Sequence, residues 1–256
     1  MFKYLNHLVV SKFVMAVTGI IILLFVTGHA IGNLQIFIGK EALNAYAAFL
    51  QGLGEILWII RIVLIIALLL HIITSIYLKL YNNGARPDKY VVTSYVKAKL
   101  NSRTMIWTGI MIAAFLGYHI LHFTVGSIQP ENYNQEEIYT KNAYSVGMGM
   151  NAHIANPEEH RGSVLNKVVY ERHDVYKMVI LGFRNPYVSG LYILGMILLG
   201  FHLSHALQSF FQTLGMAGPR FSPFIRTFSN WYGTITAIVF LIVPLAILLG
   251  FIGGNV

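Results

Sequence analysis

The stretch from Asn185 to Pro219 decides the fold. It reads NPYVSGLYILGMILLGFHLSHALQSFFQTLGMAGP and contains no Asp, Glu, Lys or Arg. A helix needs about 20 consecutive apolar residues to cross a bilayer, so this run is long enough to span one. Proline is favoured in the first turn of a helix, and Pro186 stands where this helix would begin. The stretch therefore predicts a transmembrane helix over 186–213, and this helix carries both His202 and His205.

Four further segments have the same character. Charge-free runs cover residues 13–39, 104–130 and 227–256, and residues 56–78 carry only the charge of Arg61. Only 11% of the 256 residues are charged, whereas about a quarter are charged in an ordinary soluble domain. We therefore expect an all-α membrane protein with one domain over 1–256, a bundle of five transmembrane helices. Their expected ranges are 13–38, 56–81, 104–126, 186–213 and 227–252.

The connections between these helices differ in length and charge. Residues 42–54 carry no charge but are too few to span a bilayer, so we expect an interfacial or re-entrant segment. Residues 127–185 hold seven of the ten acidic residues and form an outer polar loop. The apolar strip Val175–Phe183 is the part of this loop in which the sequence indicates order. The N-terminal apolar stretch is too long for a cleaved signal peptide and should remain in the mature protein.

The basic residues predict the orientation of the chain. The N-terminus and the connections 79–103 and 214–226 hold ten Lys and Arg residues together. The opposite side has Lys40 in a short loop and six more Lys and Arg residues in the long loop, and charges in long loops have little influence on orientation. The N-terminus is therefore expected in the cytoplasm and the C-terminus outside. The net charge of +8 fits this orientation and contact with anionic membrane lipid, so we expect no nucleic-acid partner.

Histidines carry the chemistry of this sequence. The absence of cysteine excludes disulfides, iron–sulfur ligation and thioether-attached haem. Ionisable residues inside a membrane are costly and usually functional, so an excess of histidines in the spans favours a shared ligand. Six of the ten histidines lie in predicted spans: His29, His71, His119, His122, His202 and His205. The other four lie in polar segments, where a solvated surface is the expected environment: His7, His153, His160 and His173.

Depth in the membrane sorts four of these histidines into two pairs. His29 and His119 lie about 15 residues from the cytoplasmic end of their helices, near the outer face. His71 and His202 lie equally far from the outer end, near the cytoplasmic face. At ~1.5 Å per residue the two layers are roughly 15 Å apart. Two pairs of imidazoles fit two bis-His b-type haems, which favours electron transfer.

The histidines at 122 and 205 each follow a ligand candidate by three residues. Helical periodicity alone leaves both as possible ligands, although we favour hydrogen bonds to a haem propionate, a quinone or a neighbouring helix. Small residues flank the ligand candidates, as Gly28 and Gly117 do, and would let a flat macrocycle approach the backbone. Plain helix contacts use small residues as well.

Four segments resemble the diheme cytochrome b subunit of succinate:quinone oxidoreductases. They are residues 25–33 (FVTGHAIGN), 70–77 (LHIITSIY), Gly109 with His119 ten residues later, and 190–210, which ends in GFHLSHALQSF. The resemblance is to the single-subunit, five-helix type of menaquinone-using bacteria, and it covers essentially all the predicted spans.

This resemblance implies an anchor and electron-transfer subunit of a succinate dehydrogenase or fumarate reductase in the bacterial cytoplasmic membrane. A flavoprotein and an iron–sulfur subunit would bind the cytoplasmic face, for which the connection 79–103 is the expected docking surface. Two haems b and a quinone, expected to be menaquinone, would be the cofactors. The resemblance assigns His71 and His202 to the proximal haem iron and His29 and His119 to the distal haem iron. It also favours His202 over His205 on the fourth helix.

The chain departs from the family at one position, and the roles of two charged residues stay open. A fumarate reductase of this family has a glutamate two residues before the helix 4 ligand, where this chain has Gly200, so that proton route is not expected. Glu55 is the carboxylate best placed to exchange protons with a quinone, although an ordinary interfacial charge is the more frequent role. Arg61 could pair with a distal propionate, which we favour, pair with Glu55, or extend to the surface.

Three other functions remain as alternatives. The first is the diheme cytochrome b of a hydrogenase or formate dehydrogenase. A bc-type cytochrome b fits less well, because it places paired histidines on two helices and here four helices carry them. A proton-coupled transporter would explain polar groups at depth, but would normally show more helices and carboxylates at the membrane midplane.

Overall fold

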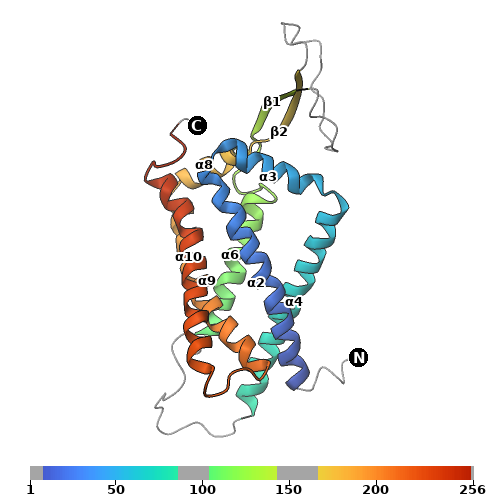
Figure 1. Cartoon of the computed structure of the whole chain (residues 1–256), viewed down its shortest axis with the longest axis vertical. Coiled ribbons are helices and arrows are strands. Elements are labelled where there is room, and N and C mark those ends of the chain that lie inside the picture. Colours follow the sequence, from blue (N-terminus) through green and yellow to red (C-terminus); the bar gives the residue numbers. More distant parts are fainter. Residues whose placement is uncertain (1–7, 86–103, 143–166, 255–256) are drawn as a thin grey trace. The chain divides into compact units, whose positions relative to one another are not determined.

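A computed structural model describes residues 8–85, 104–142 and 167–254 (Figure 1). Within this part of the chain, five helices are long and apolar enough to cross a membrane. The first of these spans joins α2 (Leu8–Asn33) to the short 3-10 helix η1 (Leu34–Phe37). The others are α4 (Glu55–Gly84), α6 (Met105–Phe123), α9 (Pro186–Thr213) and α10 (Ser222–Leu248). The chain is a helical, multi-pass membrane protein, as the composition predicts.

The chain consists of two compact units. Unit 1 comprises Met1–Ile31, Ile59–Leu116 and Leu191–Ile242, and unit 2 comprises Gly32–Trp58, Gly117–Gly190 and Val243–Val256. Unit 1 therefore contains most of the five spans. Unit 2 contains the ends of these helices together with the shorter elements between them.

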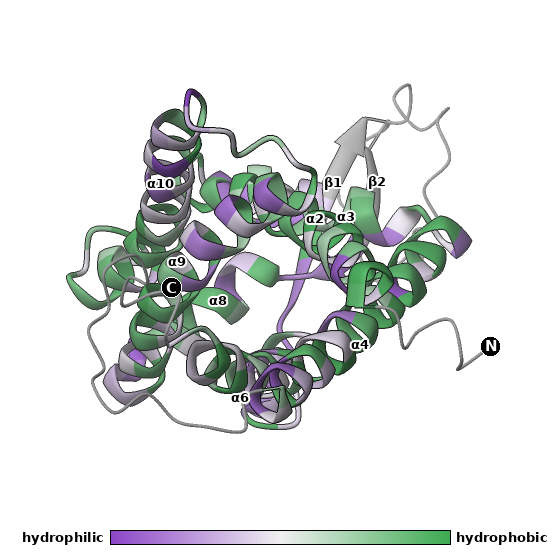
Figure 2. Cartoon of the chain, turned by 90° about the horizontal axis from the view of Figure 1, so that it is seen from below, coloured by the Kyte–Doolittle hydropathy of each residue, from purple (hydrophilic) through white to green (hydrophobic). Residues whose placement is uncertain are grey.

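The helices of unit 1 alternate in direction, so α2 and α6 run opposite to α4 and α9 (Figure 1). Seen from the end at which α2 begins, the ribbons of these four helices are mostly green, the colour of hydrophobic residues (Figure 2). Helices α9 and α10 approach closely, because a Cβ atom at Gly200 would lie 2.8 Å from Cβ of Ala237 and 3.0 Å from the Gly233 carbonyl oxygen. A glutamate at position 200 would therefore not fit unless α10 moved.

Polar side chains inside the spans bond to their own helix backbone or across to a neighbour. Thr27 donates to the Leu23 carbonyl oxygen at 2.8 Å, and its hydroxyl lies 2.6 Å from the Tyr232 hydroxyl of α10. Ser229 donates to the Ile225 carbonyl oxygen at 2.7 Å. In an apolar environment such bonds remove the cost of unpaired hydroxyl groups.

Unit 2 holds α3 (Lys40–Gly52), which includes most of the segment expected to be interfacial, and the elements of the outer loop. The loop elements are α7 (Pro130–Tyr133), β1 (Glu136–Asn142), β2 (Lys167–His173) and α8 (Val175–Arg184). The strands pair antiparallel, with Glu137 opposite Arg172. The segment Val175–Phe183 is ordered, as expected, and forms most of α8, but neither its helical form nor the strand pair was predicted from the sequence.

The expected helix ranges differ from the observed ones mainly at their starts. The first and last spans each begin five residues earlier than expected, at Leu8 and Ser222. Lys12 and Arg226 therefore lie within helices, because a charge-free run marks the hydrocarbon layer and a helix continues beyond it. The expected start at Pro186 is observed, and Asn185 accepts a hydrogen bond from the Tyr187 amide at 2.9 Å.

Candidate cofactor site

Unit 1 encloses a cavity of about 470 Å³ between α2, α4, α6 and α9. Three histidines line it: His71 of α4 and His202 and His205 of α9. Most of the wall is apolar, including Leu68, Ile72 and other aliphatic side chains. The volume falls in the range of about 300–1,000 Å³ that small-molecule and cofactor sites occupy. The structure therefore brings the expected proximal pair, His71 and His202, to one cavity.

The side chain of His71 is held through its Nδ1 atom. This atom lies 3.2 Å from the Met15 carbonyl oxygen and 3.4 Å from the Thr18 hydroxyl, both on α2. A carbonyl oxygen can only accept, so Nδ1 carries the proton and Nε2 keeps its lone pair. Metal-binding histidines are typically oriented in this way, with the other ring nitrogen bound to a backbone carbonyl.

His202 has the same arrangement. Its Nδ1 lies 3.2 Å from the Thr108 hydroxyl of α6, and this hydroxyl donates its own proton to the Met105 carbonyl oxygen at 3.0 Å. The threonine oxygen is therefore an acceptor toward Nδ1, and Nε2 of His202 keeps its lone pair as well. Both histidines have the tautomer that an iron ligand needs.

Each of these histidines packs against a threonine that is followed by a glycine. A Cβ atom at Gly19 would lie 3.3 Å from Cε1 of His71, and a Cβ atom at Gly109 would lie 3.5 Å from Cε1 of His202. The glycines allow the imidazoles to lie close to α2 and α6. This role was not predicted, although the repeated pairs Thr18-Gly19 and Thr108-Gly109, both near the starts of their expected spans, are a signal in the sequence.

The expected distal pair is divided between the units, with His29 in unit 1 and His119 in unit 2. The ring of His29 stacks on Phe25 with centroids 5.6 Å apart and lies 5.7 Å from Phe240. The His119 ring meets Phe123 edge-on at 6.1 Å. The pairing of these two histidines stays a prediction.

His122 is buried in unit 2. Its Nε2 lies 3.1 Å from Oε1 of Gln129, and its ring stacks on Phe123 with centroids 3.9 Å apart. Because Oε1 is an acceptor, Nε2 carries a proton in this contact. The geometry favours the hydrogen-bonded packing role over iron ligation for His122.

The two charged residues of α4 that the sequence suggests for the site, Glu55 and Arg61, lie in different units. Glu55 is exposed at the first turn of α4 in unit 2, and Arg61 is exposed in unit 1. Their roles toward a quinone or a propionate stay predictions.

The four histidines of the polar segments are expected on the surface. His173 is instead half-buried, with Nε2 3.4 Å from the Met178 sulfur and its ring 5.1 Å from that of Tyr133. Burial holds the pKa of His173 below its usual value against the charges of Asp174 and Glu136. His7, His153 and His160 lie outside the described residues, as do residues 86–103 of the expected docking surface.

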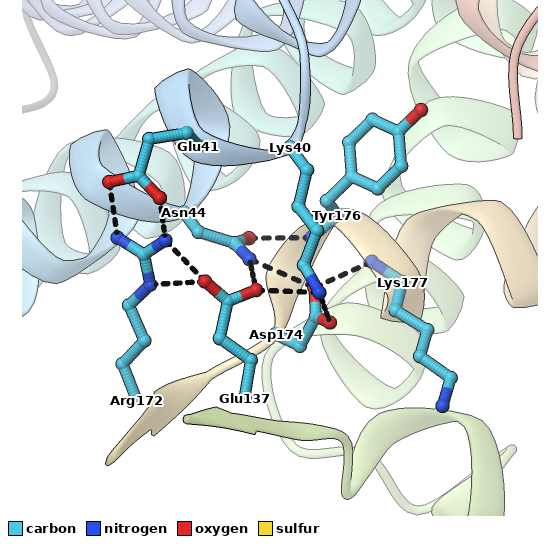
Figure 3. A network of polar contacts seen from close by, with 8 residues as sticks. All are labelled: Lys40, Glu41, Asn44, Glu137, Arg172, Asp174, Tyr176 and Lys177. Carbon is cyan, nitrogen blue, oxygen red and sulfur yellow. Dashed lines mark hydrogen bonds and ion pairs between the residues drawn. The ribbon is translucent and has the colours of Figure 1, made fainter. Parts of the chain in front are cut away.

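A second polar centre, here called the hairpin cluster, joins β1 and β2 to α3 and α8 in unit 2 (Figure 3). It consists of two cations, three carboxylates and one amide: Lys40, Arg172, Glu41, Glu137, Asp174 and Asn44.

The ammonium group of Lys40 lies 2.7 Å from Glu137 and 2.8 Å from Asp174, and Arg172 binds both Glu41 and Glu137. Burial opposes ionisation of Asp174, but hydrogen bonds from Lys40, Asn44 and the Lys177 amide outweigh it and hold its pKa below the usual range. For Glu137, Lys40 and Arg172 likewise outweigh burial and lower the pKa.

Asn44 is fully buried at the centre of the hairpin cluster. Its Nδ2 donates to Glu137 at 2.8 Å and to Asp174 at 2.9 Å, and its Oδ1 accepts from the Tyr176 amide at 2.8 Å. These bonds use both donors of the amide, so the cluster is a fixed structural joint between the strand pair and the helices.

Within residues 8–85, 104–142 and 167–254, no three His, Asp or Glu side chains are grouped so as to hold a metal ion. A haem iron needs only two protein ligands, so the donor set of the cavity fits a bis-His haem. Comparison of the chain with protein-family models, curated proteins and solved structures finds no match.

Proposed function

We propose that the chain is the membrane anchor and electron-transfer subunit of a succinate:quinone oxidoreductase, with two bis-His haems b. One observation carries the proposal. His71 and His202 line a single apolar cavity, and each uses Nδ1 for a hydrogen bond, so each keeps the lone pair of Nε2. The family resemblance of the four histidine-bearing segments supports the same assignment.

Residues that line the cavity or orient its histidines have three roles in this proposal. Met15, Thr18 and Thr108 fix the tautomer and rotation of the two imidazoles, which raises their basicity as ligands. The aliphatic wall excludes water, which favours electron transfer without proton uptake at the site. Gly19 and Gly109 let the rings lie close to the helices. When bound, haem supplies a one-electron couple between ferrous and ferric iron.

A second haem, bound by His29 and His119, would carry the electron toward a quinone near the outer face. Phe25, stacked on His29, would restrict the rotation of that imidazole. Arg61 would pair with a propionate of this haem, and Glu55 would exchange protons with the quinone, expected to be menaquinone. The flavoprotein and iron–sulfur subunits would bind the cytoplasmic face, where the positive-inside rule places the N-terminus.

Purification of the full chain from its native membrane tests the proposal. We expect a flavoprotein and an iron–sulfur protein to copurify, and succinate to reduce the haems of the complex unless the haem potentials lie too low, in which case reduced quinone should reduce them. Reduction by hydrogen or formate, with a hydrogenase or formate dehydrogenase as the partner, would replace the proposal with its closest alternative. A chain that holds no haem would contradict both and favour the transporter.

A further inference from the structure

The cavity of unit 1 changes from apolar to polar along its length. On α4 it is lined by His71, Ser75, Lys79 and Asn82, which are spaced four, four and three residues apart and therefore lie on one face of the helix. At ~1.5 Å per residue, Lys79 lies about 12 Å beyond His71 along the helix axis. Helical side chains lean toward the helix N-terminus, so the lysine leans toward the level of His71.

Helix α9 contributes the matching half of the polar end. His205, Ser209 and Thr213 follow His202 at intervals of three, four and four residues, and all line the cavity. Because α4 and α9 run in the same direction (Figure 1), their polar residues lie at the same end of the cavity. The lining residues of α2 and α6 are apolar or glycine throughout.

Among the described residues that line the cavity, Lys79 is the one charged side chain, and no carboxylate is among them. A cation beside an apolar cavity is favoured when the ligand brings an anion to it. The occupant that fits this wall therefore has an apolar body, two ligand positions for histidines and an anionic end directed toward Lys79. Haem b is an apolar macrocycle whose two carboxylates lie on one edge.

We propose that Lys79 binds a haem carboxylate, assisted by Ser75 and Asn82, and so fixes the edge of the macrocycle that faces the ends of α4 and α9. This proposal rests on the proposed function. An oxyanion could also come from the phosphate of a membrane lipid that enters the same end of the cavity, and the experiment distinguishes the two sources.

The experiment compares haem with its dimethyl ester, in which both carboxylates are blocked. Each is loaded into the full chain carrying His119→Ala, so that the expected distal site does not contribute. The measured quantity is the rate at which each is lost to excess apomyoglobin in detergent. The variants are Lys79→Gln and Lys79→Arg, and the control is Lys12→Gln, which removes the same charge from an exposed position on α2 that does not line the cavity.

We expect Lys79→Gln to lose haem about tenfold faster, as for one charge-assisted hydrogen bond. Lys79→Arg and Lys12→Gln should lose haem at about the same rate as the chain in which both lysines are unaltered. The ester should be lost about tenfold faster than haem when Lys79 is present, and Lys79→Gln should not accelerate it further. The ester comparison on the unsubstituted lysine needs no variant other than His119→Ala to fold.

Equal rates for haem and ester, or equal acceleration of both by Lys79→Gln, would overturn the carboxylate assignment and leave the proposed function standing. Loss of bound anionic phospholipid in Lys79→Gln, with the haem rate unchanged, would assign the lysine to a lipid phosphate instead. A chain that takes up no haem with His71 and His202 intact would overturn the proposed function itself.

Discussion

Replacing Thr108 with valine tests the orientation of His202 through one hydrogen bond. Valine keeps the shape of threonine but removes the oxygen that lies 3.2 Å from Nδ1 of His202. A hydrogen bond between neutral groups contributes about 0.5–1.5 kcal/mol net, but removing only the acceptor leaves the N–H group unpaired in an apolar site, which costs about 1–3 kcal/mol. A cost of ~2 kcal/mol corresponds to about thirtyfold weaker haem binding.

The same substitution at Thr18 should have a much smaller effect. Nδ1 of His71 lies 3.4 Å from the Thr18 hydroxyl, but it also lies 3.2 Å from the Met15 carbonyl oxygen, which the substitution leaves in place. We expect Thr18→Val to weaken haem binding about twofold, less than one weak hydrogen bond. The two variants therefore differ although the two histidines occupy equivalent positions.

Haem loss to excess apomyoglobin, followed optically, measures both effects in the purified chain. Thr74→Val is a matched control, because Thr74 is buried on α4 and donates to the Leu70 carbonyl oxygen without lining the cavity. Equal losses for Thr18→Val and Thr108→Val, or a larger loss for Thr18→Val, would refute the argument that hydrogen bonds at Nδ1 set the affinity.

Three further predictions concern packing and charge. Asn44→Ala removes three hydrogen bonds and should weaken the hairpin cluster by about 3 kcal/mol, seen as about hundredfold faster hydrogen exchange in the peptides covering β1 and β2; unchanged exchange would contradict a structural role. The pKa values of Asp174 and Glu137 are lowered, so their contribution is present above the unfolded value of about 4 and is lost as the pH falls below it. The hydrogen-exchange protection of the same peptides, corrected for intrinsic rates, should therefore be constant between about pH 7 and pH 5 and decrease below about pH 4. Protection that stays constant down to about pH 3 would contradict the stabilising role of the two carboxylates. Gly200→Ala should lower stability by about 1–3 kcal/mol in thermal unfolding, whereas Gly190→Ala, where a Cβ meets nothing within 4 Å, should not; equal effects would exclude the close α9–α10 contact as the cause.

The spans could be predicted because a bilayer imposes a length and an absence of charge that are visible in one sequence. Helix α9 was predicted to its first residue because Pro186 marks its start. The starts at Leu8 and Ser222 could not be predicted, since nothing in a charge-free run tells how far a helix continues into the polar layer. The placement of His71 and His202 at one cavity could be predicted because helix direction and residue counts fix the depth of each residue.

The strand pair and the hydrogen bonds that orient His71 and His202 depend on partners distant in sequence. β1 and β2 are joined by the pairing of Glu137 with Arg172 and by Lys40, which lies about a hundred residues from Glu137. The acceptors of His71 and His202 come from α2 and α6, and a sequence does not show which threonine faces which histidine.

The haem content of the purified chain tests the central claim most directly. Haem b per polypeptide, measured as the pyridine haemochrome, should be two in the unaltered chain. His71→Ala and His202→Ala should each remove one haem, and His29→Ala and His119→Ala should each remove the other. No haem in the unaltered chain would contradict the account, and so would full haem content after both His71→Ala and His202→Ala.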